Sequence, residues 1–196
     1  MPEASKRRPT IFSFQDDPPE IAYLDPSFLL NVLVAESTYH VECADFAKRL
    51  EDAESVLVLS NLGLDEIWFV LLRVQAVQEH GEKGWLSFLK ENPAKVMEYS
   101  SRLEEATLQI LEIPNLLLVE LAANQSLRAL GVMRQYGLLP RDALHTAATF
   151  EMGVGVIITT DADFALVEGL EIYTCNSTVL QMQSLCRRHA RQEKKE

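Results

Sequence analysis

Short, uniformly apolar segments alternate with longer stretches of helical periodicity along this chain, and this alternation is what most constrains its fold. The segments IAYL, SVLVLS and VGVIITT carry apolar side chains on both faces, which is typical of strands buried in a parallel sheet. Between them, apolar residues recur with the spacing of amphipathic helices, as at Ile67, Val70, Leu71 and Val74. The alternation predicts a three-layer α/β/α sandwich around a central, mainly parallel sheet of about four or five strands.

The composition divides the chain into three parts. Residues 1–20 contain four of the eight prolines together with scattered charge, which predicts a flexible N-terminal extension. Residues 21–175 carry the alternating pattern, with two extra helices expected at about 80–111. Residues 176–196 predict a C-terminal helix from about Ser177, followed by a charged tail. A length of 196 residues fits one domain with such appendages.

Charge and cysteine content argue against several classes of protein. The chain has 18 Lys and Arg against 29 Asp and Glu, a formal charge of −11, which disfavours a broad basic surface that coats nucleic acid. A metal-dependent nuclease remains compatible with this charge, because its bound cations supply part of the positive charge. The three cysteines form no C-x-x-C pair, so they indicate neither a disulfide framework nor a zinc site.

The sequence carries no signal for a membrane. Its longest apolar runs, such as FLLNVLVA and IWFVLL, are shorter than the ~18 residues that a membrane span requires. Its N-terminal stretch is basic but has no hydrophobic run of the signal-peptide type. We therefore expect a cytoplasmic protein with no membrane association.

Four carboxylates occupy informative places in this pattern. Asp25 and Asp161 each follow an apolar strand, whereas Glu66 and Asp142 lie near the start of helical patterns. Ligands of an open parallel sheet bind outside the carboxyl ends of its strands. If the strands before Asp25 and Asp161 are neighbours, these carboxylates share one edge, to which helices could bring the other two. Clustered carboxylates repel one another, and such a cluster is typical of a site for a divalent cation.

Each carboxylate also has a local structural explanation. Asp25, which precedes a proline, is suited to a turn or a helix N-cap, and Asp142 is suited to the first turn of a helix. Asp161 and Asp163 could cap a short turn, and Glu66 could be one solvated helix residue. Taken singly, these explanations are the more common ones. The occurrence of all four residues in this order, each in a matching local context, favours a shared site.

The helix around Asp142 is predicted to carry a polar stripe. Asp142, His145, Thr146 and Thr149 follow helical spacing, and alanines and a leucine occupy the opposite side. We expect this stripe to face away from the core. A histidine at such a position is more often a packing or solvent-facing residue than a partner of Asp142.

Four segments together resemble the PIN domain, the fold of VapC-type toxin ribonucleases and related nucleases. They are LDPSFLLNVL around Asp25, LDEIWFVLL around Glu66, LLPRDALHTAATFEMG around Asp142 and VIITTDADF around Asp161. The resemblance covers about residues 21–175, and PRDALH followed by TTDADF is its most specific part. The chain departs from the family's usual pattern at Pro26, where Thr or Ser is frequent, and at Thr160, where Asn is frequent.

This resemblance implies a site and a reaction. Asp25, Glu66, Asp142 and Asp161 would be the catalytic, metal-binding set, with Asp163, Thr159 and Ser27 as auxiliary residues. The implied cofactor is Mg²⁺ or Mn²⁺, which prefer oxygen ligands, and the implied reaction is hydrolysis of RNA phosphodiester bonds. Arg141, next to Asp142, is the candidate for binding the substrate backbone. The family further implies an antitoxin protein as a partner and a homodimer.

Two other functions compete with this interpretation. The first is a non-catalytic PIN-like module that binds a protein partner through the helices at about 80–111. The second is a phosphatase of the haloacid-dehalogenase type, which also places an aspartate at the end of its first strand. That chemistry requires a second aspartate where Ser27 stands and a lysine before the late acidic pair, so the sequence disfavours it.

Overall fold

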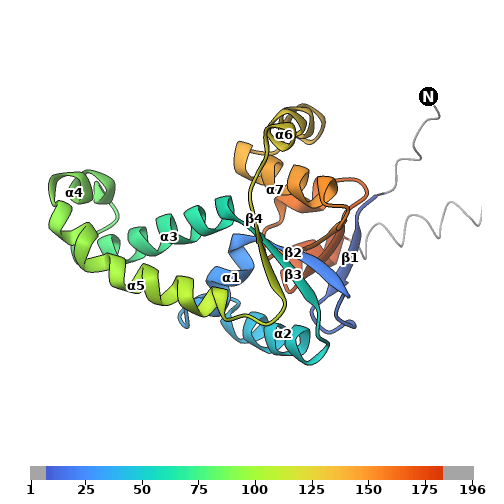
Figure 1. Ribbon diagram of the computed structural model, residues 1–196, viewed down its shortest axis with the longest axis horizontal. Helices are drawn as coiled ribbons and strands as arrows, with labels where there is room; N and C mark the ends of the chain where they lie inside the picture. The colour runs from blue at the N-terminus through green and yellow to red at the C-terminus, as the bar shows by residue number, and fades with distance from the viewer. Residues whose placement is uncertain (1–7, 183–196) are drawn as a thin grey trace, which may run out of the picture.

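Six short strands form one parallel sheet in the computed structural model, which describes residues 8–182 (Figure 1). The strands lie in the order β1-β6-β5-β2-β3-β4, and every neighbouring pair is parallel. Their bounds are Thr10–Ser13 (β1), Ile21–Leu24 (β2), Val56–Ser60 (β3), Leu116–Val119 (β4), Val156–Ile158 (β5) and Glu171–Thr174 (β6). The predicted α/β architecture is confirmed, but the expected number of about four or five strands is wrong, because the N-terminal segment adds β1.

Helices cover both faces of this sheet (Figure 1). One face packs against α1, α2 and the sheet-proximal parts of α3 and α5, and the other packs against α6, α7 and η1. The bounds are Pro26–Leu33 (α1), His40–Asp52 (α2), Asn61–His80 (α3), Trp85–Glu91 (α4), Pro93–Leu111 (α5), Ala123–Tyr136 (α6), Pro140–Glu151 (α7) and Asp163–Leu166 (η1, a 3₁₀ turn). A further helix begins at Ser177, as expected, and the tail from residue 183 lies outside the described residues.

The central strand β2 shows why the sequence has apolar residues on both sides of its strands. Successive side chains of a strand point to opposite faces. Ala22 and Leu24 accordingly belong to the core beneath α1 and α2, whereas Tyr23 belongs to the core beneath α6 and α7. All three are fully buried. A polar group on either face must therefore find its hydrogen-bond partner inside the protein.

The helix α3 begins directly at the end of β3, at Asn61. The hydroxyl of Ser60 caps it by accepting a hydrogen bond from the backbone N–H of Gly63 (3.2 Å). Gly63 permits a close approach, because a Cβ atom there would lie 2.6 Å from a side-chain methyl of Leu59. This tight strand-to-helix junction determines where Glu66, on the second turn of α3, enters the site.

The expected extra helices are α4 and α5, which with the distal part of α3 extend away from the sheet (Figure 1). A small separate core holds this helical arm together, formed by Ala76, Leu89 and Tyr99. Glu79 of α3 accepts a hydrogen bond from the Tyr99 hydroxyl and lies 2.7 Å from the ammonium group of Lys95. None of the helices among residues 8–182 is long and apolar enough to cross a membrane.

The expectation of a flexible extension is wrong for Thr10–Ser13, which form the edge strand β1. Thr10 pairs with Glu171 of β6, and the following Phe14 is only 2% exposed. The ring of Phe14 stacks on Phe46 of α2, and the guanidinium of Arg49 donates hydrogen bonds to the carbonyl groups of Phe14 and Asp16. The flanking prolines and charges conceal this short strand in the sequence. Residues 1–7 lie outside the described residues.

Replacement of Phe14 by alanine tests whether this segment belongs to the core. We expect Phe14→Ala to lower the free energy of unfolding by roughly 3–5 kcal/mol, because it removes a buried aromatic ring and leaves a cavity. Urea unfolding followed by circular dichroism measures this change. Asp17→Ala, an exposed change in the same segment, should alter stability by less than about 0.5 kcal/mol. Equal stability of both variants would show that the segment is a dispensable extension.

Candidate functional site

The strands β5, β2 and β3 lie side by side, and their carboxyl ends form the edge that carries Asp25 and Thr159. Asp25 follows β2 directly, and its backbone N–H donates to the carbonyl of Ile158, the last residue of β5 (3.0 Å). The two strands that the sequence suggested as neighbours are thus paired. This pairing brings Asp25 next to Thr159, from which 134 positions separate it in the chain.

Asp25 is a buried carboxylate held by three hydrogen bonds. It is 5% exposed, and its Oδ2 atom accepts from the backbone N–H of Ser27 (3.1 Å), from the Ser27 hydroxyl and from the Thr159 hydroxyl (2.9 Å). Burial raises the pKa of Asp25, while His145 and the hydroxyls of Ser27 and Thr159 act to lower it. Asp25 is also the N-cap of α1, and the proline that follows fits the first helical position. The local explanation and the site are therefore compatible.

The two auxiliary hydroxyls also hold the chain that leaves β5. Ser27 Oγ accepts from the backbone N–H of Thr160 (3.0 Å), and Thr159 Oγ1 accepts from that of Asp161 (2.9 Å). Each hydroxyl therefore donates to Asp25 and accepts from the segment that carries Asp161. The auxiliary role in catalysis expected for Ser27 and Thr159 stays a prediction.

Two asparagines that the sequence reasoning missed support the same segment. Asn176 donates from its side chain to the carbonyl of Thr160 (2.8 Å), and Asn31 donates to the hydroxyl of Thr160 (3.2 Å). Asn31 lies on α1, and Asn176 follows β6. Neither residue has a local signature, because its role depends on an element that is distant in the sequence.

The pKa of Asp142 depends partly on the other carboxylates. It lies in the first turn of α7, and burial together with repulsion from Asp161, Asp25 and Asp163 raises the pKa of Asp142 to about 6, while His145 acts in the opposite direction. The carboxylate of Asp161 accepts the backbone N–H of Asp163 (2.9 Å) and so caps the turn before η1. Asp25, Asp142 and Asp161 therefore share one electrostatic environment.

Glu66 reaches this region from α3 and binds a histidine. Its Oε1 atom lies 2.9 Å from Nε2 of His145, and its side chain is 16% exposed. On the other side of the imidazole, Nδ1 lies 2.7 Å from the hydroxyl of Tyr23, which lies 2.7 Å from the hydroxyl of Ser60. His145 is buried, so the solvent-facing interpretation is wrong, and the carboxylate partner of its imidazole is Glu66 and not Asp142.

The polar stripe of α7 does not face away from the core. His145 is 1% exposed, and Thr146 and Thr149 are fully buried, as are the alanines on the opposite side of the helix. The predicted outward stripe fails because α7 packs against the sheet, against α6 and against η1, which together enclose its middle. Thr149 satisfies its hydroxyl by donating to the carbonyl of His145 (2.8 Å).

Arg141 lies at the start of α7, beside Glu66. Its guanidinium nitrogens are 3.8 Å from the carboxylate oxygens of both Asp65 and Glu66, and its central carbon lies 5.8 Å from the centroid of the Phe69 ring. The side chain is 47% exposed. The long ion pairs leave the guanidinium weakly held, so that an incoming anion could compete for it.

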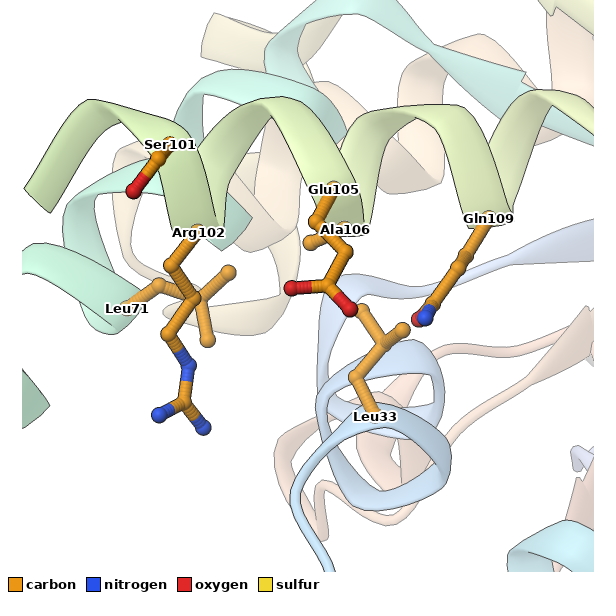
Figure 2. Close-up of a pocket in the computed structure, with 7 residues that line it drawn as sticks. All are labelled: Leu33, Leu71, Ser101, Arg102, Glu105, Ala106 and Gln109. Carbon is orange, nitrogen blue, oxygen red and sulfur yellow. The ribbon is translucent and has the colours of Figure 1, made fainter.

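A pocket of about 290 Å³ opens elsewhere, between the helical arm and α1. Figure 2 shows Arg102, Glu105 and Gln109 projecting from one side of α5 near Leu33 of α1. Leu71, Ser101 and Ala106 complete its lining. None of the four predicted carboxylates lines this pocket, so it is separate from the acidic edge.

The chemistry of the acidic edge fits a hard divalent cation. Within residues 8–182, no three His, Cys, Asp or Glu side chains lie close enough together to hold a metal ion as they stand. Burial raises the pKa of Asp142 most, and repulsion from the neighbouring carboxylates raises it further; a bound cation would relieve that repulsion. Carboxylate oxygens are the ligands that Mg²⁺ and Mn²⁺ prefer. Ligation would require the carboxylates to move closer together.

The parallel sheet and its acidic edge define an α/β protein of the PIN type. The family model for the PIN domain matches residues 22–170, and the chain therefore belongs to the PIN domain family. This match confirms the resemblance drawn from the sequence. Among curated proteins, none matches this chain.

Several solved structures are similar to this chain at low sequence identity. VapC20 of Mycobacterium tuberculosis, described as a sarcin-ricin loop cleaving toxin, is 18% identical with a TM-score of 0.48, covering 76% of this chain and 98% of its own. VapBC2 of Rickettsia felis, solved with a promoter DNA fragment, is 12% identical with a TM-score of 0.47, covering 79% and 98%. A toxin-antitoxin complex of Klebsiella pneumoniae is 17% identical with a TM-score of 0.44, covering 76% and 94%.

The raised pKa of Asp142 predicts a pH-dependent effect on stability in metal-free protein. In the unfolded chain this carboxyl ionises near its usual value of 3.8, whereas in the folded protein it ionises near 6. The unfolded state therefore binds fewer protons between these values, and the contribution of Asp142 to stability falls as pH rises through this window. In EDTA at pH 8, Asp142→Asn should be more stable than wild type by roughly 1 kcal/mol, after allowance for solvent screening.

Thermal unfolding of both proteins from pH 4 to pH 8 tests this expectation. The advantage of Asp142→Asn should be largest above pH ~6 and disappear near pH ~4. Asp45→Asn, an exposed carboxylate change on α2, serves as the control and should show no such trend. An advantage that is constant across this range would contradict the electrostatic origin.

Proposed function

We propose that this PIN domain is a metal-dependent endoribonuclease that uses Mg²⁺ or Mn²⁺ to hydrolyse phosphodiester bonds of RNA. One observation carries the proposal: the buried Asp25 at the end of β2 lies within electrostatic reach of Asp142, whose pKa also responds to Asp161. Repulsion among carboxylates gathered in this way lowers the stability of the fold, and a bound cation would offset it. Membership of the PIN domain family supports this interpretation.

Each residue has a role in this proposal. Asp25, Asp142, Asp161 and Glu66 would hold the cation, and Ser27 and Thr159 orient Asp25 through their hydroxyl groups. Asp163 adds negative charge beside Asp142. When bound, the cation supplies charge stabilisation for the scissile phosphate and an activated water as nucleophile. Hydrolysis of this kind needs no covalent bond between a side chain and the RNA.

Arg141 is suited to bind the RNA backbone. Its guanidinium is half exposed and is held only by ion pairs of 3.8 Å. A phosphate can form two parallel hydrogen bonds with a guanidinium, which is a stronger interaction than these long pairs. The stacking of Arg141 against Phe69 restricts its side chain before the substrate arrives.

Cleavage of a mixed RNA pool by purified protein is the direct test. We expect cleavage with Mn²⁺ or Mg²⁺ and none with EDTA. Asp25→Asn and Asp142→Asn should each lose at least ~100-fold in activity, because they weaken the binding of the cation that stabilises the transition state. Asp45→Asn should retain wild-type activity. In the same assay Arg141→Ala should raise KM by roughly tenfold with a smaller change in kcat, because it removes one charged hydrogen bond to the substrate.

The outcomes separate this function from its main alternative. Cleavage that survives Asp142→Asn at the wild-type level would refute the site. The alternative is a non-catalytic PIN-like module that acts through a protein partner. It is favoured by the separation of the carboxylates, which do not lie at ligand distance among residues 8–182. Under that alternative no metal supports cleavage, and Asp25→Asn leaves the partner complex intact.

We further propose that the enzyme is the toxin of a toxin–antitoxin pair, as its resemblance to VapC-type ribonucleases implies. Controlled expression of the chain alone in a bacterial host tests this role. Wild-type protein should stop growth, and Asp142→Asn, expressed to the same level, should not. Growth that is equally unaffected by both would contradict a toxin role, even if the purified protein cleaves RNA.

A further inference from the structure

A buried chain of polar groups connects the core to Glu66, and its other members have no part in the function described so far. It runs from Ser60 through Tyr23 and His145 to Glu66, with successive distances of 2.7, 2.7 and 2.9 Å. Its members belong to β3, β2, α7 and α3, so four elements must be in place to build it. Ser60 and Tyr23 are fully buried, and His145 is 1% exposed.

The proton on the glutamate side of His145 follows from the geometry. Nε2 faces an oxygen of Glu66 at 2.9 Å, and an ionised carboxylate can only accept a hydrogen bond. Nε2 therefore carries a proton and donates it. At Nδ1 the hydroxyl of Tyr23 can act as donor or acceptor, so this nitrogen is satisfied in either case. Burial raises the pKa of Tyr23, which keeps the phenol protonated.

The hydrogen bond from His145 uses one of the two oxygens of Glu66. Oε1 accepts from the imidazole, whereas Oε2 lies 3.8 Å from a guanidinium nitrogen of Arg141. A glutamate on a helix has several rotatable bonds, and this contact fixes the end of the side chain.

We propose that His145 is a positioning residue, which donates from Nε2 to Glu66 and leaves Oε2 as the oxygen that a cation would bind. This inference rests on the proposed metal-dependent function. Tyr23 and Ser60 hold the imidazole from behind, so that it cannot rotate away from Glu66. Groups that orient a ligating side chain commonly change metal affinity by about 10- to 100-fold.

Two substitutions of His145 separate positioning from packing. The amide nitrogen of Gln reaches about as far as Nε2, and that of Asn reaches only about as far as Nδ1. His145→Gln can therefore still donate to Glu66, whereas His145→Asn can bond only toward Tyr23. Titration of Mn²⁺ against each protein without RNA, followed by the electron paramagnetic resonance signal of free Mn²⁺, reads out binding independently of cleavage.

We expect His145→Asn to weaken Mn²⁺ binding by about 10- to 100-fold and His145→Gln by only a few-fold. Glu66→Gln should weaken binding at least as much as His145→Asn, because it removes the charged ligand that His145 positions, and the double variant should be no weaker than Glu66→Gln alone. His145→Asn that binds Mn²⁺ as tightly as wild type would overturn the proposal. Wild-type protein that binds no Mn²⁺ would instead overturn the proposed function, and the positioning role with it.

A milder variant covers the case in which replacement of His145 prevents folding. Tyr23→Phe removes only the hydroxyl behind the imidazole and should weaken Mn²⁺ binding by about 3- to 10-fold, with the Nε2–H resonance of His145 exchanging faster with water in nuclear magnetic resonance spectra. Tyr173→Phe, which removes a tyrosine hydroxyl from β6, is the matched control and should leave both readouts unchanged. Identical behaviour of the two tyrosine variants would overturn the proposal.

Discussion

The hydrogen bonding of Asp25 at the end of β2 is the interaction on which the rest of the site depends. The hydroxyls of Ser27 and Thr159 each donate to this carboxylate, and each accepts a backbone N–H from the segment that leaves β5. A buried charge without such partners would be costly. The same bonds that make the charge tolerable also fix the segment that carries Asp161. The same hydrogen bonds therefore stabilise the Asp25 carboxylate and determine the shape of the acidic edge.

Like charges nevertheless remain close together, and the structure accommodates them by giving each a local role. Asp25 caps α1, Asp142 lies in the first turn of α7, and Asp161 caps the turn before η1. Each position offers backbone N–H groups that favour a negative charge. These roles reduce the repulsion without removing it: burial is the largest cause of the raised pKa of Asp142, and repulsion from Asp161 and Asp25 adds to it. The remaining repulsion is what a divalent cation would relieve.

The helical arm and the acidic edge are stabilised by different sets of contacts. The arm has its own small core of Ala76, Leu89 and Tyr99, beyond the end of the sheet. The edge depends on parallel strands and on the junctions that follow them. The pocket beside α5 lies on the arm's side of the molecule and includes none of the four carboxylates. Changes in the arm should therefore affect the site mainly through α3, which carries Glu66 and belongs to both parts.

Local pattern in the sequence indicated most of the strands and helices, the PIN family and the four candidate carboxylates, because each of these depends on residues that are near one another in the chain. Ser27 and Thr159 could also be named from the sequence, through the resemblance to the PIN family. Only the tertiary structure decided that Thr10–Ser13 join the sheet, since this short strand is stable only beside β6. It likewise decided that the polar side of α7 is buried, and that His145 forms hydrogen bonds with Glu66 and Tyr23 and not with Asp142. Those features depend on partners from distant elements, and helical or strand spacing carries no information about which distant side chain will complete a buried hydrogen bond.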